Sequence, residues 1–291
     1  MFAAATAAGH RALGLRPETL AVGPWQLRVY RGGRPGGEPW LLLHGLGATS
    51  GTFLPLLHGL LPEVEVALPE LSELGGTRGP RPAPSVSEAA DLVAACASHC
   101  FPAQPPTLGG ISLGGWIALR ALLAHPGLAS RLLLVVPGGW RDQDWQRISV
   151  MVRPETLAEA RSLWRALFFD PPWWMRPARY GLFLAYRSRA VRAILATVRE
   201  DDAFGADDLA RLDLPVGLIW GREDRLFRAE VGEAMRRALP RAWLESIPAA
   251  AHGVQWERPR EFVAAVDRFR AAFPLPGGGG RAQDPGRSES G

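Results

Sequence analysis

Residues 108–115 read LGGISLGG and contain the complete pattern G-x-S-x-G at Gly110-Ile111-Ser112-Leu113-Gly114. The apolar run 106–111 before Ser112 is typical of a buried strand, and residues 113–124 after it are typical of a helix. In that setting the pattern forms a tight, strained turn that holds the serine hydroxyl clear of the sheet, at a helix N-terminus that favours developing negative charge. A side chain at Gly110 or Gly114 is expected to collide with the neighbouring strand or helix. A chain with 33 glycines among 291 residues can contain the pattern G-x-S-x-G by chance. The neighbouring segments therefore decide whether Ser112 is a nucleophile.

A serine hydroxyl is a poor nucleophile until a base removes its proton, and the base must itself be oriented. Asp224 follows the buried-strand pattern 216–220, and His252 follows the strand-like run 242–247. An alternative acid is Asp142 or Asp144, after the preceding strand. We favour Asp224, because it lies one short turn beyond a clear buried strand, whereas the segment 140–142 is typical of the polar start of an insertion.

The order Ser112, Asp224, His252, with the His44-Gly45 turn after the buried run 40–43, resembles the α/β-hydrolase superfamily. The resemblance spans about residues 20–272 and is closest to the single-domain esterase, lipase and C–C hydrolase branch. It implies that Ser112 is the nucleophile, that His252 is the general base and then acid, and that Asp224 orients the imidazole. It also implies an oxyanion hole formed by the backbone N–H groups of Leu46 and Leu113. The resemblance further implies that His44 shapes the turn behind the oxyanion hole and takes no part in proton transfer.

One segment departs from the pattern of this superfamily. The turn after the strand 64–68 usually reads close to D-L-P-G-x-G-x-S, whereas residues 70–77 read ELSELGGT. Glu70 and Glu73 thus replace the aspartate and the first glycine. Because this turn is structural in the superfamily, we expect the change to alter a loop near the site and not the chemistry.

Strand and helix patterns alternate along the chain, which predicts an α/β-hydrolase fold with a mostly parallel eight-stranded sheet and helices on both faces. An antiparallel hairpin, 19–22 with 25–30, is expected at the sheet edge. The predicted organisation is a loose lead-in over 1–18, a core over 19–139 and 205–273, a helical cap insertion over 140–204, and a disordered, glycine-rich tail over 274–291. Within the cap, helices are expected at 154–169, 177–186 and 190–199.

The predicted cap is dense in aromatic residues, and most of them are expected to pack it on the core. The crowded run 168–174 reads FFDPPWW and is expected to line an acyl pocket or to face a lipid surface. The predicted substrate pocket comprises Trp140, Phe168, Phe169, Trp173 and Trp174. Five arginines of the cap could attract anionic head groups or solvate a helix face: Arg176, Arg179, Arg187, Arg189 and Arg192.

The chain carries 33 basic residues, all arginine, and a formal net charge of only +4. No dense basic block interleaved with aromatics resembles a nucleic-acid site, so no nucleic-acid partner is expected. Cys96 and Cys100 lie four apart on a predicted helix, poorly placed for a disulfide and without the partners of a metal site, so we expect free thiols and no metal or cofactor. No signal-peptide pattern or apolar run of about 20 residues is present, which makes the cytoplasm the expected location, with transient membrane contact through the cap. The oligomeric state stays open.

These features favour hydrolysis of a small-molecule carboxylic ester with an apolar acyl part, through an acyl-enzyme on Ser112. The alternative within the fold is C–C bond hydrolysis of a ring-cleavage product, a chemistry that often uses a cap arginine to hold a substrate carboxylate. A protein that only binds ligands is disfavoured, because all three triad residues are present. Epoxide or haloalkane hydrolysis would need an aspartate nucleophile, and position 112 is serine.

Overall fold

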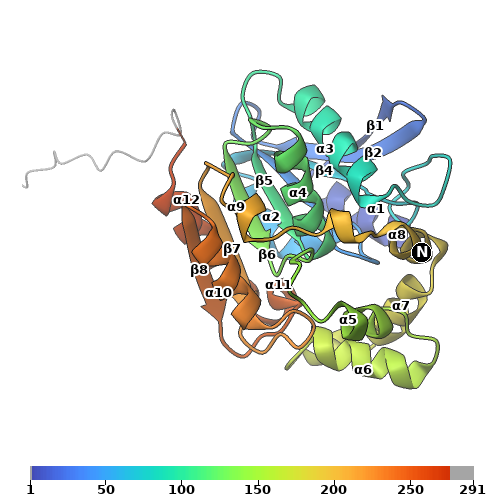
Figure 1. Cartoon of the computed structure of the whole chain (residues 1–291). Helices are drawn as coiled ribbons and strands as arrows, with labels where there is room; N and C mark the ends of the chain where they lie inside the picture. Colours follow the sequence, from blue (N-terminus) through green and yellow to red (C-terminus); the bar gives the residue numbers. More distant parts are fainter. Residues whose placement is uncertain (1, 276–291) are drawn as a thin grey trace, which may run out of the picture.

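The computed structural model describes residues 2–275. Its centre is an eight-stranded sheet in the order β1-β2-β4-β3-β5-β6-β7-β8, drawn in Figure 1. β1 and β2 form an antiparallel hairpin at one edge, β2 pairs antiparallel with β4, and β3 to β8 run parallel. The predicted mostly parallel eight-stranded sheet is therefore confirmed, as is the edge hairpin. The strands span Arg16–Val22, Trp25–Gly33, Glu38–Leu43, Val64–Pro69, Thr107–Ile111, Arg131–Val135, Val216–Gly221 and Ala242–Ile247.

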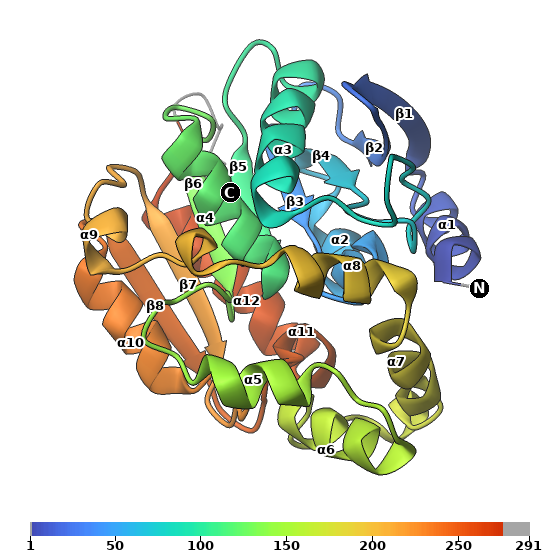
Figure 2. The same cartoon turned by 45° about the vertical axis from the view of Figure 1, so that its right-hand side comes forward.

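Helices cover both faces of this sheet (Figure 2). α3 packs beside α4 on one face, and α2 packs beside α12 on the other. The residues of β5, β6 and β7 are buried along their whole length, which explains their continuous apolar runs, because a parallel strand covered on both faces has no polar side. The helices of this body are α2 Leu54–Leu60, α3 Val86–Cys100, α4 Leu113–Ala124, α9 Ala206–Leu209, α10 Ala229–Ala238, α11 Val254–Glu257 and α12 Pro259–Ala272.

The N-terminal segment differs from the prediction. Residues Phe2–Ala12 form helix α1, and β1 begins at Arg16, so a loose lead-in over 1–18 is wrong for these residues. Thr6 and His10 are buried, and the His10 ring meets Tyr30 edge-on with centroids 4.5 Å apart. Burial lowers the pKa of His10 to about 4, so the neutral ring is the form that packs. The alanine-rich sequence at 3–8 favours a helix, and packing on Tyr30 anchors it.

The insertion between β6 and β7 is helical, as predicted. It holds α5 Trp145–Met151, α6 Leu157–Leu167, α7 Ala178–Tyr186 and α8 Arg189–Thr197, with the short 3₁₀ turns Trp173–Met175 and Glu200–Asp202. The three predicted helices are found within a few residues of their expected ends, whereas α5 was not predicted. Figures 1 and 2 show α5, α6 and α7 grouped away from the sheet, with α8 returning toward the body. The domain boundaries 140–204 stay a prediction, and the predicted tail lies outside the described residues from position 276 onward.

Candidate active site

Ser112 stands in the tight turn between β5 and α4. Its backbone has φ 54° and ψ −117°, a region that residues other than glycine rarely adopt. A Cβ at Gly110 would lie 2.4 Å from the carbonyl oxygen of Gly114, and a Cβ at Gly114 would lie 2.1 Å from the carbonyl oxygen of Leu43. Both contacts are far shorter than van der Waals distance and involve backbone, so the two glycines are required, as the sequence predicts. The turn therefore stores the strain typical of a functional residue.

The turn after β3 lies directly beside this serine. A Cβ built on Gly45 would stand 3.3 Å from the Cβ of Ser112 and 3.4 Å from the carbonyl oxygen of Ile111. Leu46 is the next residue, and Gly47 turns the chain away with φ 68°. Leu113 is the first residue of α4, where backbone N–H groups have no acceptor within the helix. The two segments predicted to supply an oxyanion hole thus flank the serine turn.

His44 fastens the turn after β3 to the loop after β4. Its Nδ1 lies 3.0 Å from the carbonyl oxygen of Gly45, and its Nε2 accepts a hydrogen bond of 2.9 Å from the backbone N–H of Leu71. Because Nε2 is an acceptor, Nδ1 carries the proton and donates it to Gly45. Both ring nitrogens are engaged with backbone, which fits a residue that shapes the turn.

Glu70 is the residue at which the chain departs from the usual turn sequence, and it is completely buried. Its carboxylate accepts hydrogen bonds from the backbone N–H of Ser50 at 3.2 Å and from the Ser50 hydroxyl at 2.5 Å. Its Oε2 lies 3.4 Å from Nε2 of His44. Burial raises the pKa of Glu70, while the hydrogen bonds from Ser50 oppose that shift. The Glu70 carboxylate therefore links Ser50, in the segment after Gly47, to the loop after β4. Leu71 in the same loop donates the hydrogen bond to His44.

His252 and Asp224 form a buried hydrogen-bonded pair. Nδ1 of His252 donates to Oδ2 of Asp224 at 2.8 Å, and both side chains are almost inaccessible to water. Oδ1 of Asp224 accepts from the backbone N–H groups of Leu226 at 2.8 Å and Phe227 at 2.9 Å, which sets the carboxylate plane. With Nδ1 donating, Nε2 is left as the basic nitrogen of the imidazole. The Phe227 ring meets the imidazole edge-on at 5.1 Å and helps to hold it.

The alternative acid, Asp144, has another role. It caps the N-terminus of α5 by accepting a hydrogen bond of 2.9 Å from the backbone N–H of Arg147, and its side chain is exposed. The hydrogen bond to His252 is made by Asp224, as we expected. That Asp224 serves as the catalytic acid partner stays a prediction.

The loop that carries His252 is bound to the insertion. The backbone N–H of Gly253 donates to the carbonyl oxygen of Leu167 at 2.8 Å. The buried carboxylate of Glu257 accepts from Ala251 at 2.8 Å through one oxygen, and from Phe169 at 2.8 Å and Asp170 at 2.6 Å through the other. Burial raises the pKa of Glu257, and these three hydrogen bonds oppose the shift. Sequence reasoning missed Glu257, because its partners lie almost ninety residues away and no motif marks it.

The loop that carries Asp224 is also bound to the insertion. The guanidinium of Arg147, on α5, donates to the carbonyl oxygens of Arg225 and Leu226, both at 2.9 Å. Residues on either side of the His252–Asp224 pair are therefore tied to helices of the insertion. A movement of the insertion would therefore displace the loops that carry Asp224 and His252.

The five aromatic residues of the predicted substrate pocket lie in different environments. Trp140 is buried and packs edge-on against Phe204 at 6.1 Å. Phe168 stacks on Trp164 at 4.4 Å and lies against Gly253, whose Cβ would stand 2.2 Å from the ring. Phe169, Trp173 and Trp174 are exposed. That these residues form an acyl wall stays a prediction.

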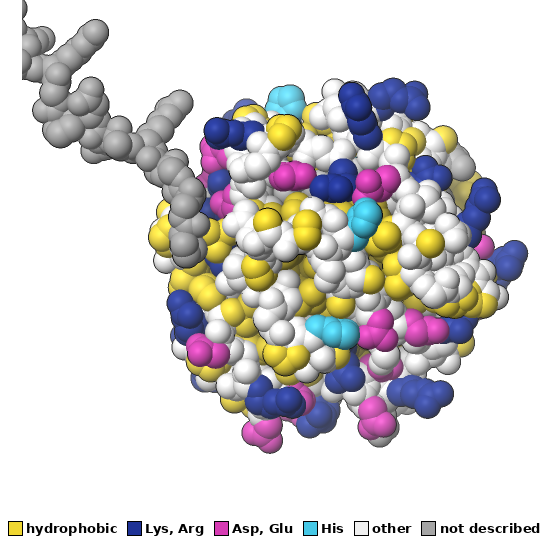
Figure 3. Space-filling view, turned by 90° about the horizontal axis from the view of Figure 1, so that it is seen from above, with side chains coloured by type: hydrophobic (Ala, Val, Ile, Leu, Met, Phe, Trp, Pro, Cys, Tyr) yellow, Lys and Arg dark blue, Asp and Glu magenta, His cyan; other side chains and the backbone are white. Residues whose placement is uncertain are grey.

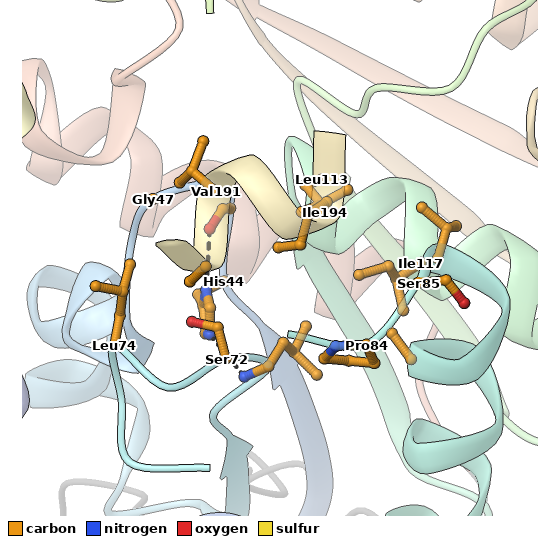
Figure 4. A pocket seen from close by; sticks show the side chains of 15 residues that line it. His44, Gly47, Ser72, Leu74, Pro84, Ser85, Leu113, Ile117, Val191 and Ile194 are labelled. Atoms are coloured by element: carbon orange, nitrogen blue, oxygen red, sulfur yellow. Dashed lines mark hydrogen bonds between the residues drawn. The ribbon is translucent and has the colours of Figure 1, made fainter. Parts of the chain in front are cut away.

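A narrow apolar pocket opens beside Leu113, between α8, the start of α4 and the loop after β4 (Figure 4). Its free volume is about 10 Å³, roughly one water molecule. His44, Gly45 and Gly47 are among its lining residues, and none of the five predicted aromatic residues lines it. Its aliphatic lining includes Leu71, Leu74, Ile117, Val191 and Ile194.

Other expectations concern metal, redox and membrane features. Cys96 and Cys100 are buried free thiols, as predicted. Between residues 2 and 275, no three His, Cys, Asp or Glu side chains gather as a metal site would require. None of the helices in this range combines the length and the apolar character needed to cross a bilayer.

The strained serine turn at the carboxyl end of a central strand, with a histidine–carboxylate pair after two later strands, defines a hydrolase of the α/β type. Residues 40–266 match the profile of the alpha/beta hydrolase family, and the chain belongs to that family.

Among the relatives of the chain is the pimeloyl-[acyl-carrier protein] methyl ester esterase of Chromobacterium violaceum. It is 28% identical over 244 residues, which cover 79% of this chain and 93% of that protein. The human monoacylglycerol lipase is 22% identical, over 90% of this chain and 84% of the lipase. Among solved structures, the 2-hydroxy-6-oxo-6-phenylhexa-2,4-dienoate hydrolase of Rhodococcus sp. strain RHA1 superposes with a TM-score of 0.73 at 20% identity, covering 88% of this chain and 99% of that one. At that identity the likeness shows a shared fold.

Proposed function

We propose that the protein hydrolyses carboxylic esters with an apolar acyl part, through an acyl-enzyme formed on Ser112. The family and its ester-hydrolysing relatives support the ester bond as the target. The observation that carries the proposal is the buried hydrogen bond of 2.8 Å between His252 and Asp224, in a protein whose serine occupies a strained nucleophile turn. An imidazole held by a carboxylate at Nδ1 is prepared to accept a proton at Nε2.

In this mechanism the Ser112 hydroxyl attacks the ester carbonyl while Nε2 of His252 takes its proton. Negative charge develops on the carbonyl oxygen, and the backbone N–H groups of Leu46 and Leu113 stabilise it. His252 then gives its proton to the departing alcohol, which leaves the acyl group on Ser112. A water molecule, deprotonated by the same imidazole, attacks the acyl carbonyl, and the imidazolium returns that proton to the Ser112 oxygen as the acid leaves. Asp224 stabilises the imidazolium in both steps.

The lining of the pocket beside Leu113 supports an apolar acyl group. Leu71, Leu74, Ile117, Val191 and Ile194 present aliphatic surface next to the predicted oxyanion segments. A pocket with space for one water cannot hold a chain of several methylenes, so its walls must separate to admit one. No arginine lines the pocket within the described residues, so C–C hydrolysis has no partner there for a substrate carboxylate.

The proposal is tested with p-nitrophenyl esters from acetate to decanoate, beside a ring-cleavage dienoate as the substrate of the alternative reaction. We expect turnover of the esters and none of the dienoate, with the enzyme labelled at Ser112 by a fluorophosphonate. Turnover of the dienoate without ester hydrolysis would replace the proposal by the C–C reaction.

The chain-length preference tests the position of the acyl pocket. Ile194→Phe should narrow the pocket and exclude about two methylenes, at a cost of about 1.6 kcal/mol, which is about fifteenfold in kcat/KM for decanoate. Acetate, which does not reach Ile194, should be hydrolysed at the wild-type rate.

Ala196→Phe places the same side chain on an exposed position of the same helix and serves as the control. It should leave both rates unchanged. Parallel loss of acetate and decanoate hydrolysis in Ile194→Phe would show that Ile194 supports the fold and does not form the acyl wall.

A further inference from the structure

Large apolar side chains are exposed on one part of the insertion, the turn Trp173–Met175 and helix α7. The exposed fractions are 76% for Trp173, 52% for Trp174, 62% for Tyr180 and 43% for Leu184. Single exposed apolar residues are ordinary on protein surfaces, but four large ones within twelve residues are not. None of them lines the pocket beside Leu113.

The same stretch is strongly basic. Residues 171–199 contain six arginines and no aspartate or glutamate, a charge of +6, which exceeds the net charge of +4 of the whole chain. The face shown in Figure 3, seen from above Figure 1 and so opposite α5 to α7, carries basic and acidic side chains interspersed. The positive charge of the chain is therefore concentrated in the segment 171–199, and the other residues together carry a small negative charge.

The exposed apolar and basic residues follow helical spacing. Trp173, Arg176, Tyr180, Leu184 and Arg187 are separated by three or four positions, which places them along one side of the 3₁₀ turn and α7. Figures 1 and 2 both place α7 at the outer edge of the molecule, away from the sheet.

The arginines on and beside α7 differ in their contacts with carboxylates. Arg187 packs its guanidinium over Phe183 at 5.3 Å and lies 3.8 Å from the carboxylate of Glu155. Within residues 2–275, Arg176 and Arg179 are exposed and make no ion pair.

We infer that the surface formed by Trp173, Trp174, Arg176, Arg179, Tyr180 and Leu184 docks on a lipid bilayer that contains anionic lipids. Tryptophan and tyrosine favour the boundary between head groups and acyl chains, because their rings are apolar and carry one polar group. Arginines at that depth meet lipid phosphates, and a surface of apolar and basic side chains together is typical of peripheral membrane binding. An acidic protein partner would satisfy the arginines but would leave the exposed tryptophans without the apolar layer that a bilayer offers. This docking surface does not depend on the chemistry at Ser112.

Co-flotation with vesicles tests the inference. The two vesicle types are phosphatidylcholine alone, and phosphatidylcholine with about 30% phosphatidylglycerol. We expect the full chain to float with the anionic vesicles, to bind the neutral ones at least tenfold more weakly, and to be released by high salt. Each arginine near an anionic surface contributes about fivefold to partitioning, so Arg176→Glu combined with Arg179→Glu should reduce binding by more than tenfold. Trp173→Ala should reduce it about tenfold through lost apolar burial.

Matched controls lie elsewhere on the molecule. Arg237→Glu makes the same charge change on an exposed position of α10, and Val150→Ala removes exposed apolar surface from α5. Both should bind vesicles as the wild type does, and the far-UV circular dichroism spectrum and melting temperature check that each variant is folded. The inference is overturned if no vesicle is bound, or if the charge reversals at positions 176 and 237 weaken binding equally. It is also overturned if the Trp173 and Arg176 substitutions instead dissociate a dimer in sedimentation, which would assign the surface to a second copy of the chain.

Discussion

Ser112→Ala is expected to abolish ester hydrolysis while the fold stays intact. Removing the nucleophile of a serine hydrolase typically lowers kcat by about 10⁵-fold or more, leaving only the contribution of the oxyanion hole and of substrate binding. The thermal stability should change little, because alanine keeps the Cβ of serine and so keeps the same backbone strain at φ 54°. The measurement is kcat/KM for p-nitrophenyl butyrate, together with the melting temperature of both proteins.

Ser98→Ala provides the control, since Ser98 lies exposed on α3 and its hydroxyl bonds only to the carbonyl oxygen of Ala94. It should keep full activity. A fluorophosphonate should label the wild type and Ser98→Ala but not Ser112→Ala. If Ser112→Ala retained a tenth of the activity, Ser112 would not be the nucleophile.

The serine turn and the central strands could be predicted because their causes are local. Gly110 is required by a backbone contact within the turn, which follows from the strand–turn–helix pattern. Gly114 is required by a backbone contact with the end of β3, which follows from the pairing of β3 with β5. The central strands are continuous apolar runs because both of their faces are covered. The pairing of Asp224 with His252 also follows from topology, since β7 and β8 are neighbours and both residues follow their carboxyl ends.

The features that sequence reasoning missed depend on contacts between distant segments. Glu257 has no motif, and its role arises only where the loop after α6 meets the loop after His252. The pocket beside Leu113 is lined in part by Val191 and Ile194 on α8, almost eighty residues away in sequence, and no local pattern connects these residues with the serine turn. Helix α1 was missed because its stability comes from burial of Thr6 and His10 against the body.

Asp224→Asn is expected to lower kcat about 10⁴-fold with little change in stability. The two backbone N–H groups of Leu226 and Phe227 need an acceptor at the position of Oδ1, so the amide oxygen of the asparagine should occupy it. The amide NH₂ then faces Nδ1 of His252, where the wild type has the acceptor Oδ2. A donor at that place forces the proton of the neutral imidazole onto Nε2, and such an imidazole cannot accept the proton of Ser112.

Asp144→Asn is the matched control for the same change of carboxylate to amide. Asparagine caps a helix as well as aspartate does, so α5 should keep its start and the variant should hydrolyse p-nitrophenyl butyrate at the wild-type rate. We measure kcat and the melting temperature of both variants. A fall in kcat at an unchanged melting temperature shows that the acceptor for Nδ1 of His252 was lost, and a fall in both shows loss of structure. An inactive Asp144→Asn variant together with an active Asp224→Asn variant would show that Asp144 is the acid partner of His252. The insertion would then have to rearrange during turnover, because in this structure Asp144 caps α5 and Asp224 accepts the hydrogen bond of 2.8 Å from His252.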